Sequence, residues 1–448
     1  MPAPFRGWCG NRKERREMEG IEGPVIAGLD THKREHSLCL LDGLGRKVFE
    51  GFFPADEKGY ESVAEAIGDP GDCVVVGIEC TMTYGAGICR HLVSKGYNVV
   101  EVLNPEKKGK RRAGEGKDDL GDAERAARAA IAGKHTSTPK AGDGWVEALR
   151  CLTVSRKAAV KSSTAAVNAV KSLITSAPEH VRKRFSDMGA KEMMASLSRK
   201  RTKSDVVEEG LFASLRSLAL MWAECQKQAD EAKGRMEELL EENAPALLAI
   251  GGCGPMSAAA LAIAAGDNPD RMGSKHSFAA LCGVSPVAAS TAEKAVTRYR
   301  LNRGGNRQAN CALYHIAISR MKNDERTKAY VAKRRADGKS MKETRRCLKR
   351  YISNEVYRAL LNPRDVPEQK GPALRELRTS LGFTQRNVAF LLGVNQACVS
   401  NMELGRKRDR ELETRYEELL GKLSDRVGPA ASSGLAKRRV AEKGLDRQ

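Results

Sequence analysis

The chain has 448 residues, a formal net charge of +20 and a pI near 9.5. This length predicts two to four folded units, and the positive charge favours polyanionic partners such as nucleic acid. The longest apolar run, around residues 257–265, is too short to cross a bilayer, so no membrane association is expected.

The N-terminus and the cysteine pattern exclude several classes of protein. Residues 1–20 form a basic extension without an apolar signal segment. The 12 cysteines contain no C-x-x-C pair and the 7 histidines show no ligand spacing, which argues against disulfides and zinc. We expect a soluble, cytoplasmic and nucleoid-associated protein, in which any essential metal is Mg²⁺ or Mn²⁺ held by carboxylates.

Residues 21–145 alternate between strand and helix patterns and predict an α/β domain. Residues 25–53 are predicted to form two β-runs, joined by the turn Asp42-Gly43-Leu44-Gly45. The elements expected after them are a helix at 58–67, a buried strand at 73–78, a helix at 84–95 and a strand at 97–103.

Four carboxylates of this domain are candidates for one metal site. Asp30 ends the first β-run and Glu79 ends the buried strand, so both are expected at the same end of the sheet. Asp119 and Asp122 share one face of a helix that starts near residue 116. Together they could hold two divalent cations for phosphodiester displacement. The alternative is that they are loop acids and acids that favour a helix N-terminus.

Residues 146–245 carry a helical pattern, in which 206–243 suggests a long helical pair or coiled coil that mediates self-association. A second compact, α-helical unit is predicted for 246–361. It opens with a glycine-rich turn at 250–256 that resembles a helix-hairpin-helix turn, whose N–H groups approach a DNA phosphate. A tight turn between helices without DNA fits the spacing equally well.

A hydroxyl-containing turn and an arginine-rich segment follow inside this second unit. Ser290 and Thr291 precede the arginines Arg298, Arg300 and Arg303, a combination that offers a nucleophile beside phosphate-binding groups. From the residues alone, a solvated loop next to a basic groove is the simpler interpretation.

The C-terminal part is predicted to contain a linker at 362–372, a small helical module at 373–422 and a disordered basic tail at 423–448. Within the module, Thr384 is expected to cap one helix, Gly393 to close it and Asn395 to cap the next. The predicted shared core is apolar: Val388, Leu391, Leu392, Val394, Val399 and Met402.

The motifs Gly28-Leu29-Asp30-Thr31, Gly77-Ile78-Glu79-Cys80 and Lys117-Asp118-Asp119-Leu120-Gly121-Asp122 resemble the DEDD transposases of the insertion-sequence one-ten family, which includes Piv-like invertases. The resemblance implies an RNase-H/RuvC-like N-terminal domain with Asp30, Glu79, Asp119 and Asp122 as metal ligands. It also implies Mg²⁺-dependent strand exchange and an element-encoded guide RNA.

The resemblance also covers the second unit, where the family carries a serine nucleophile. The family's usual Ser-Gly pair aligns with Thr291-Ala292, and Ser290 adjoins it. The departure leaves both hydroxyls as candidates and places strand-exchange activity in question.

The segment from Leu374 to Arg406 resembles the lambda-repressor-like helix-turn-helix family. That resemblance implies that Gln385 binds a phosphate and that Gln396, Ala397, Ser400 and Asn401 face the major groove of double-stranded DNA.

The leading hypothesis is a transposase or site-specific recombinase that acts on element ends and target DNA as a homodimer or homotetramer. The alternative is a catalytically inactive, transposase-derived DNA-binding regulator. A third hypothesis is a junction-resolving nuclease that uses the acidic site without a serine intermediate.

Overall fold

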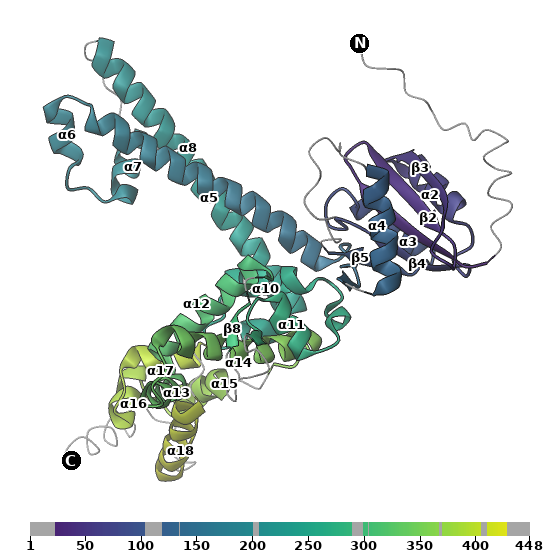
Figure 1. Ribbon diagram of the computed structural model, residues 1–448. Helices are drawn as coiled ribbons and strands as arrows, with labels where there is room; N and C mark the ends of the chain where they lie inside the picture. The colour runs from purple at the N-terminus through teal and green to yellow at the C-terminus, as the bar shows by residue number, and fades with distance from the viewer. Residues whose placement is uncertain are drawn as a thin grey trace.

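The computed structural model describes residues 23–103, 119–133, 135–199, 206–288, 299–302, 304–366, 370–404 and 410–427. Figure 1 shows an α/β domain, a long helical arm, a helical unit at the base of the arm and a C-terminal helical module. Within the described ranges, no helix is long and apolar enough to span a membrane.

The N-terminal domain is built on a six-stranded mixed sheet with the order β3-β2-β1-β4-β5-β6. β1 pairs with β4, and β4 with β5, in parallel, whereas the other neighbours are antiparallel. The strands are β1 (Val25–Thr31), β2 (Glu35–Leu41), β3 (Lys47–Pro54), β4 (Cys73–Ile78), β5 (Val99–Val102) and β6 (Thr136–Ser137).

The first part of the sheet has three strands, so the prediction of two β-runs was wrong. The first run divides into β1 and β2 at a short polar turn, where the His32 N–H donates to the Glu35 carbonyl at 3.1 Å. The turn residues His32, Lys33 and Arg34 include no glycine, proline or asparagine, so they carry no typical turn signal in the sequence. The Asp42–Gly45 turn is confirmed as the β2–β3 connection, with Gly45 at φ +78°.

Helices cover both faces of the sheet. α2 (Glu57–Ile67) and α3 (Ala86–Ser94) pack on one face against apolar side chains of β1, β2 and β4. α4 (Asp119–Ala132) packs on the opposite face through Ala123, Ala127 and Ala130. The alternation of side chains along β1 and β4 therefore decides which residues lie under α4.

Two glycines allow α4 to lie directly on the sheet. A Cβ at Gly28 would stand 2.2 Å from the Ala123 carbonyl oxygen and 2.3 Å from the Ala127 nitrogen. A Cβ at Gly77 would stand 2.6 Å from the Ala126 carbonyl oxygen. Because backbone atoms cannot yield as a flexible side chain can, glycine is required at both positions for this packing.

Replacing Gly28 by alanine is expected to destabilise the N-terminal domain by about 1–3 kcal/mol, because the added methyl must displace α4. Hydrogen exchange of β1 and α4 amides measures the change. The matched control is Gly43→Ala, where the nearest atom to an added Cβ is at 3.8 Å. Equal protection in the two variants would contradict the packing argument.

The segment that leaves the α/β domain is fastened to the second unit. The Lys140 ammonium donates to the Ile263 carbonyl at 2.6 Å, and the Val146 N–H donates to the Asp267 carboxylate at 2.9 Å. Arg271 returns a bond to the Thr138 carbonyl at 2.6 Å. These bonds join residues more than 120 positions apart, so the two units are linked by more than the covalent chain.

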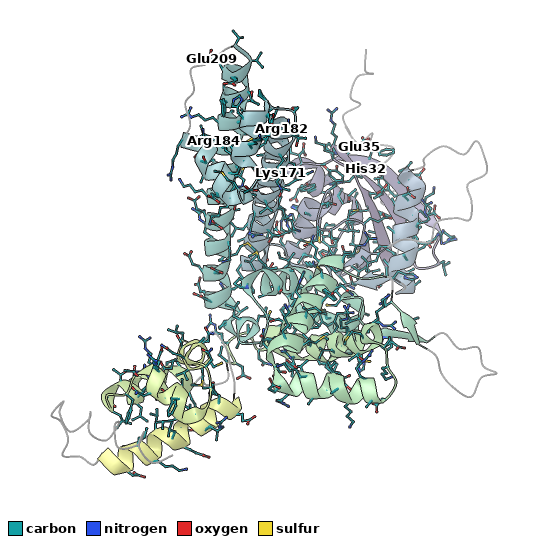
Figure 2. All side chains as sticks on the ribbon, turned by 90° about the vertical axis from the view of Figure 1, so that its left-hand side faces the viewer. His32, Glu35, Lys171, Arg182, Arg184 and Glu209 are labelled. Atoms are coloured by element: carbon teal, nitrogen blue, oxygen red, sulfur yellow. The ribbon has the colours of Figure 1, made fainter. Side chains whose placement is uncertain are left out.

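The predicted helical pair is confirmed as a long antiparallel arm. It consists of α5 (Trp145–Thr175) and α8 (Val206–Asn243), and α6 (Glu179–Phe185) and α7 (Ala190–Arg199) close its far end around a separate apolar core. Figure 2 shows Lys171, Arg182 and Arg184 at that far end, close to the start of α8.

The second unit is mainly helical and surrounds the base of the arm. Its helices are α9 (Pro245–Leu248), α10 (Pro255–Ala265), η1 (Pro269–Met272), α11 (Lys275–Leu281), α12 (Arg307–Asn323), α13 (Glu325–Ala336) and α14 (Met341–Leu361). The purely α-helical prediction missed the short hairpin of β7 (Pro286–Ala288) and β8 (Tyr299–Leu301). Strands of three residues are too short to produce a recognisable period.

The C-terminal module has its own apolar core, formed by α15 (Lys370–Ser380), α16 (Gln385–Leu392), α17 (Gln396–Glu403) and α18 (Arg410–Val427). α15 begins inside the predicted linker, since Pro372 in its first turn needs no helical donor. α18 continues to Val427, so the start of the predicted disordered tail is helical.

Candidate functional site

Asp30 and Glu79 occupy neighbouring positions on two parallel strands. The register pairs Leu29 of β1 with Ile78 of β4, and the Glu79 N–H donates to the Leu29 carbonyl at 3.2 Å. Each acid follows an apolar residue of the α2–α3 face, so both side chains belong to the α4 face. The expectation that these two carboxylates meet at one end of the sheet agrees with this register.

The Glu79 carboxyl lies in a partly buried environment that disfavours its charge. Burial, followed by the negative charge of Asp30, raises the pKa of Glu79 to about 6, against the opposing effect of Arg125. Its Oε1 atom is buried and has no hydrogen-bond partner among the described residues. Asp30 is only 8% exposed, and its Oδ2 lies 3.7 Å from Nδ1 of His32, which Figure 2 places at the sheet edge beside Glu35.

Helix α4 supplies the remaining predicted acids. Asp119 is the first residue of α4, but its side chain lies outside the described part of the structure. Asp122 is one turn further and forms an ion pair with Arg125. Asp122 directly precedes Ala123, which packs on Gly28, two residues from Asp30. The packing of α4 thus carries Asp122 toward the strand ends.

A buried carboxylate oxygen without a donor, beside a second carboxylate, suits a hard divalent cation. Among the described side chains, no group of three or more His, Cys, Asp or Glu residues is arranged to hold a metal ion. The side chain of Asp119 is not among them. The geometry therefore supports a two-carboxylate centre at Asp30 and Glu79, and the four-acid arrangement stays a prediction.

The predicted nucleophiles lie outside the described residues. Ser290, Thr291, Arg298 and Arg303 belong to the undescribed positions, and Arg300 is described only as part of the β8 backbone. What the structure describes is the base of the hairpin, where Asn302 donates to the Ser285 hydroxyl at 3.1 Å.

The predicted glycine-rich turn joins α9 to α10 and packs on α12. Gly252 has φ +81°, and the Arg320 side chain donates to the Gly251 carbonyl at 2.7 Å. A turn between two helices is therefore present at this place, and its contact with DNA stays a prediction.

The capping residues of the C-terminal module are confirmed. Thr384 accepts from the Asn387 N–H at 3.1 Å, Gly393 ends α16 at φ +65°, and Asn395 accepts from the Ala397 N–H at 2.9 Å. Of the predicted core, Leu391 is 44% exposed, so its assignment was wrong; it points away because the buried stripe of α16 runs through Val388 and Leu392.

The residues assigned to DNA differ in accessibility. Gln396 and Ala397 at the start of α17 are exposed, whereas Ser400 and Asn401 are half-buried. Gln385 is half-buried, and its side-chain amide donates to Oε2 of Glu403 at 2.7 Å.

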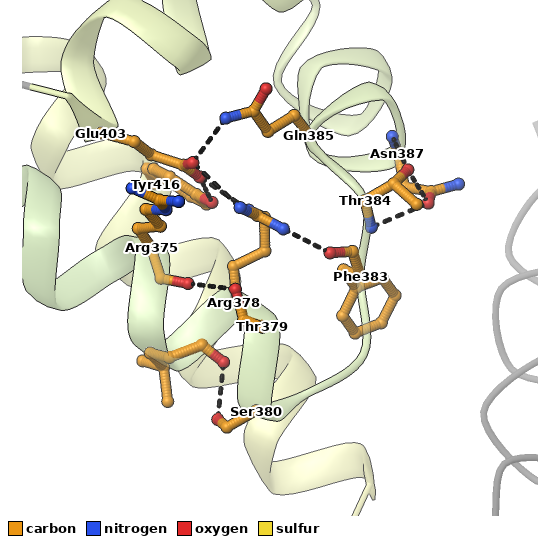
Figure 3. Close-up of polar contacts among 11 residues, drawn as sticks. Arg375, Arg378, Thr379, Ser380, Phe383, Thr384, Gln385, Asn387, Glu403 and Tyr416 are labelled. Atoms are coloured by element: carbon orange, nitrogen blue, oxygen red, sulfur yellow. Dashed lines mark hydrogen bonds and ion pairs between the residues drawn. The ribbon is translucent and has the colours of Figure 1, made fainter.

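A buried polar network, which the sequence reasoning missed, holds this module together (Figure 3). Arg378 donates to both oxygens of Glu403 at 2.6 and 2.9 Å and to the Phe383 carbonyl at 2.7 Å. The Tyr416 hydroxyl donates to Oε1 of Glu403 at 2.6 Å. Burial acts to raise the pKa of Glu403, but the bonds from Arg378, Tyr416 and Gln385 hold it below its usual range. The sequence contained one clue to this network. Arg378 lies one helical turn after the buried Leu374, and Glu403 one turn after the buried Val399, so each charged residue continues an apolar stripe.

Comparison with known protein families defines the chain as a transposase. One model, described as a transposase of the DEDD IS110 type, matches residues 27–177, and a second, described as the transposase IS116/IS110/IS902 family, matches residues 244–332. Together the matches cover more than half of the sequence. The protein belongs to the IS110 family of DEDD transposases, as its motifs predicted. A search of curated proteins found no match.

Proposed function

We propose that this transposase cleaves and rejoins DNA strands with a divalent cation, Mg²⁺ or Mn²⁺, at Asp30, Glu79, Asp119 and Asp122. The observation that carries the proposal is the Asp30–Glu79 pair at the ends of two parallel strands, with a buried Glu79 oxygen that lacks a donor. The strand order, with α4 across one face, supports a RuvC-like domain.

The roles of the protein groups follow from their positions. A bound cation would polarise a phosphodiester and neutralise charge on its oxygens. Asp30 and Glu79 would hold it from the rigid sheet, and α4 would bring Asp119 and Asp122 from above. Arg125 forms an ion pair with Asp122 and also acts on Glu79, so it would balance the negative charge of the acids when no cation is bound.

The proposed nucleophile is the hydroxyl of Ser290 or Thr291. Its oxygen would bond to phosphorus while the displaced deoxyribose oxygen leaves with a proton, and attack by a second strand's hydroxyl would restore the side chain. Threonine restricts χ1, which favours Ser290 slightly on steric grounds. The family alignment points to Thr291. Arg298, Arg300 and Arg303 would bind the flanking phosphates.

A suicide DNA substrate that traps a covalent intermediate tests this assignment. With Mg²⁺, the wild-type protein is expected to give a phosphoryl adduct, and either Ser290→Ala or Thr291→Ala should remove it. Peptide mapping of the adduct identifies the residue. An adduct that persists in both variants would exclude this pair of hydroxyls.

The C-terminal module is proposed to bind element ends as a helix-turn-helix. Gln396→Ala is expected to relax sequence preference. Gln385→Ala, which also removes the bond to Glu403, should weaken binding to all sequences alike. Binding curves with specific and scrambled duplexes at several salt concentrations separate these effects. Identical losses in both variants would contradict the division into base and phosphate contacts.

A second candidate is the catalytically inactive regulator. The altered Ser-Gly motif and the exposed start of α17 favour it. Intact duplex binding without any covalent adduct would support this candidate. We include a homodimer or homotetramer and an element-encoded guide RNA in the leading proposal, because the arm suits self-association and the family resemblance implies the RNA.

A further inference from the structure

Helices α12 and α14 pack against each other and share a line of cationic and aromatic side chains. The Lys349 ammonium donates to Oδ1 of Asn310 at 2.8 Å. One turn away, the Arg345 guanidinium donates to the Tyr314 hydroxyl at 3.2 Å and lies 5.9 Å from the ring centre. We call Lys349, Arg346, Arg345 and Tyr314 the α12–α14 track.

One end of the track stands at the base of the β7–β8 hairpin. The side-chain amide of Asn310 donates to the Cys282 and Gly283 carbonyls at 2.9 and 3.1 Å, just before β7 begins. On the β8 side, the backbone of Gly305 packs directly against the same segment, since a Cβ at position 305 would lie 2.6 Å from the Gly283 nitrogen. Through Asn310, Lys349 is therefore fixed relative to the hairpin.

The three cations of the track form no ion pair among the described residues of these helices, although the Glu343 carboxylate, one turn before Arg346, interacts with Arg346 electrostatically. The ion pairs of described α12–α14 residues are Arg320–Glu355, Lys328–Glu325 and Arg334–Asp337, and none of them includes a track residue. Lys349 is half-buried, and burial, together with the charge of Arg346, lowers its pKa. A partly desolvated ammonium with a cationic neighbour gains most from an external anion.

The arrangement of the track matches an extended polyanion rather than a single ion. Residues three or four apart on a helix have Cβ atoms about 5–6 Å apart, so Arg345, Arg346 and Lys349 present charges in succession. Tyr314 is 38% exposed and offers a ring surface beside them. Successive cations along an aromatic group are typical of surfaces that bind single-stranded nucleic acid.

We propose that the α12–α14 track binds the phosphates of a single DNA strand next to the β7–β8 hairpin, with Tyr314 stacking on a base. The inference rests on the proposed DNA-strand chemistry of the hairpin. It adds residues of α14, which begins beyond the family match at 244–332.

Binding of the full-length protein to a fluorescent single-stranded DNA oligonucleotide, measured by anisotropy against salt concentration, tests the proposal. The double variant Arg346→Gln/Lys349→Gln is expected to reduce the slope of log K against log salt by about 1.4, or 0.7 per lost phosphate contact. Arg346→Gln alone should give half of this change without disturbing the Lys349–Asn310 bond. Tyr314→Leu should weaken binding by roughly fivefold or more at an unchanged slope.

The matched control is Arg358→Gln, an exposed arginine of α14 on the opposite face from Lys349. Its slope should equal that of the wild type. If all variants share the wild-type slope, the track is not a DNA site, although the proposed function stands. If the wild type binds no DNA, the proposed function itself fails. A loss confined to an RNA oligonucleotide of the same sequence would overturn the assignment to DNA.

Discussion

A Glu79→Gln variant is expected to lose DNA-strand cleavage while becoming more stable when no divalent cation is present. Removing one charge-stabilising group from such a centre typically lowers the rate by a hundredfold to a thousandfold, and the loss of a metal ligand should reach about the upper value. The opposite effect on stability arises because Glu79 is held beside Asp30 in a partly buried site, where its pKa is raised to about 6.

The pH dependence gives this prediction its sign. Protonated Glu79 is favoured in the folded state, so its contribution to stability is present below pH 4.5 and is lost as the pH rises through about 6. The neutral glutamine avoids this loss and should stabilise β1 and β4 by about 1–2 kcal/mol at pH 7.5, with no gain at pH 4. Hydrogen exchange of β4 amides with and without Mg²⁺ measures both effects.

Glu124→Gln is the matched control on α4, since Glu124 pairs with Arg128 at 2.8 Å rather than with the acidic pair. It should retain cleavage and show the wild-type stability. Normal cleavage by Glu79→Gln would show that this carboxylate is not part of the active site. A destabilised Glu79→Gln domain would show instead that Glu79 has a structural partner.

Glu403→Ala should unfold the C-terminal module at much lower denaturant concentration. Removing one member of a buried ion pair costs about 3–5 kcal/mol, because its partner is left without a counter-charge. Here Arg378, Tyr416 and Gln385 would all lose an acceptor. Chemical unfolding of a fragment spanning residues 362–427, which contains the module's own core, measures the change.

The control pair lies in the same module: Lys370 and Glu417 are joined at 2.5 Å on the surface, and Glu417→Ala should cost no more than about 1 kcal/mol. Because the pKa of Glu403 is lowered, its contribution is present above pH 4.5 and is lost as the pH falls through its lower folded value. Equal effects of the two alanine substitutions would show that the buried network is no stronger than a surface pair.

Regular elements with a clear period were predictable from the sequence. The apolar run at 73–78 is β4, the amphipathic segment at 206–243 is α8, and the Thr384, Gly393 and Asn395 caps fall where their turn chemistry required. The turn between β1 and β2 was missed because its residues, His32 to Arg34, include none of the usual turn formers glycine, proline and asparagine. The β7–β8 hairpin was missed because it depends on tertiary packing of Gly283 and Gly305 rather than on local pattern.

The candidate site was predictable only as residue types at the ends of elements. Asp30 and Glu79 could be placed at the sheet edge, but their shared face depends on the β1–β4 register and on Gly28 and Gly77 admitting α4. Arg378 and Glu403 could not be paired from the sequence, because they lie 25 positions apart on two different helices, α15 and α17. Charged residues on an apolar stripe were the clue to that pair.

The helical arm begins and ends at one place: Trp145 at the start of α5 and Asn243 at the end of α8 line the same small cavity. A 31-residue helix extends about 46 Å, yet the polypeptide returns to its point of departure. Matched deletions of two helical turns from both α5 and α8 would shorten the arm without moving Trp145 and Asn243 at its base. Insertions or deletions can therefore change the length of the arm in related proteins while the units at its base keep their geometry.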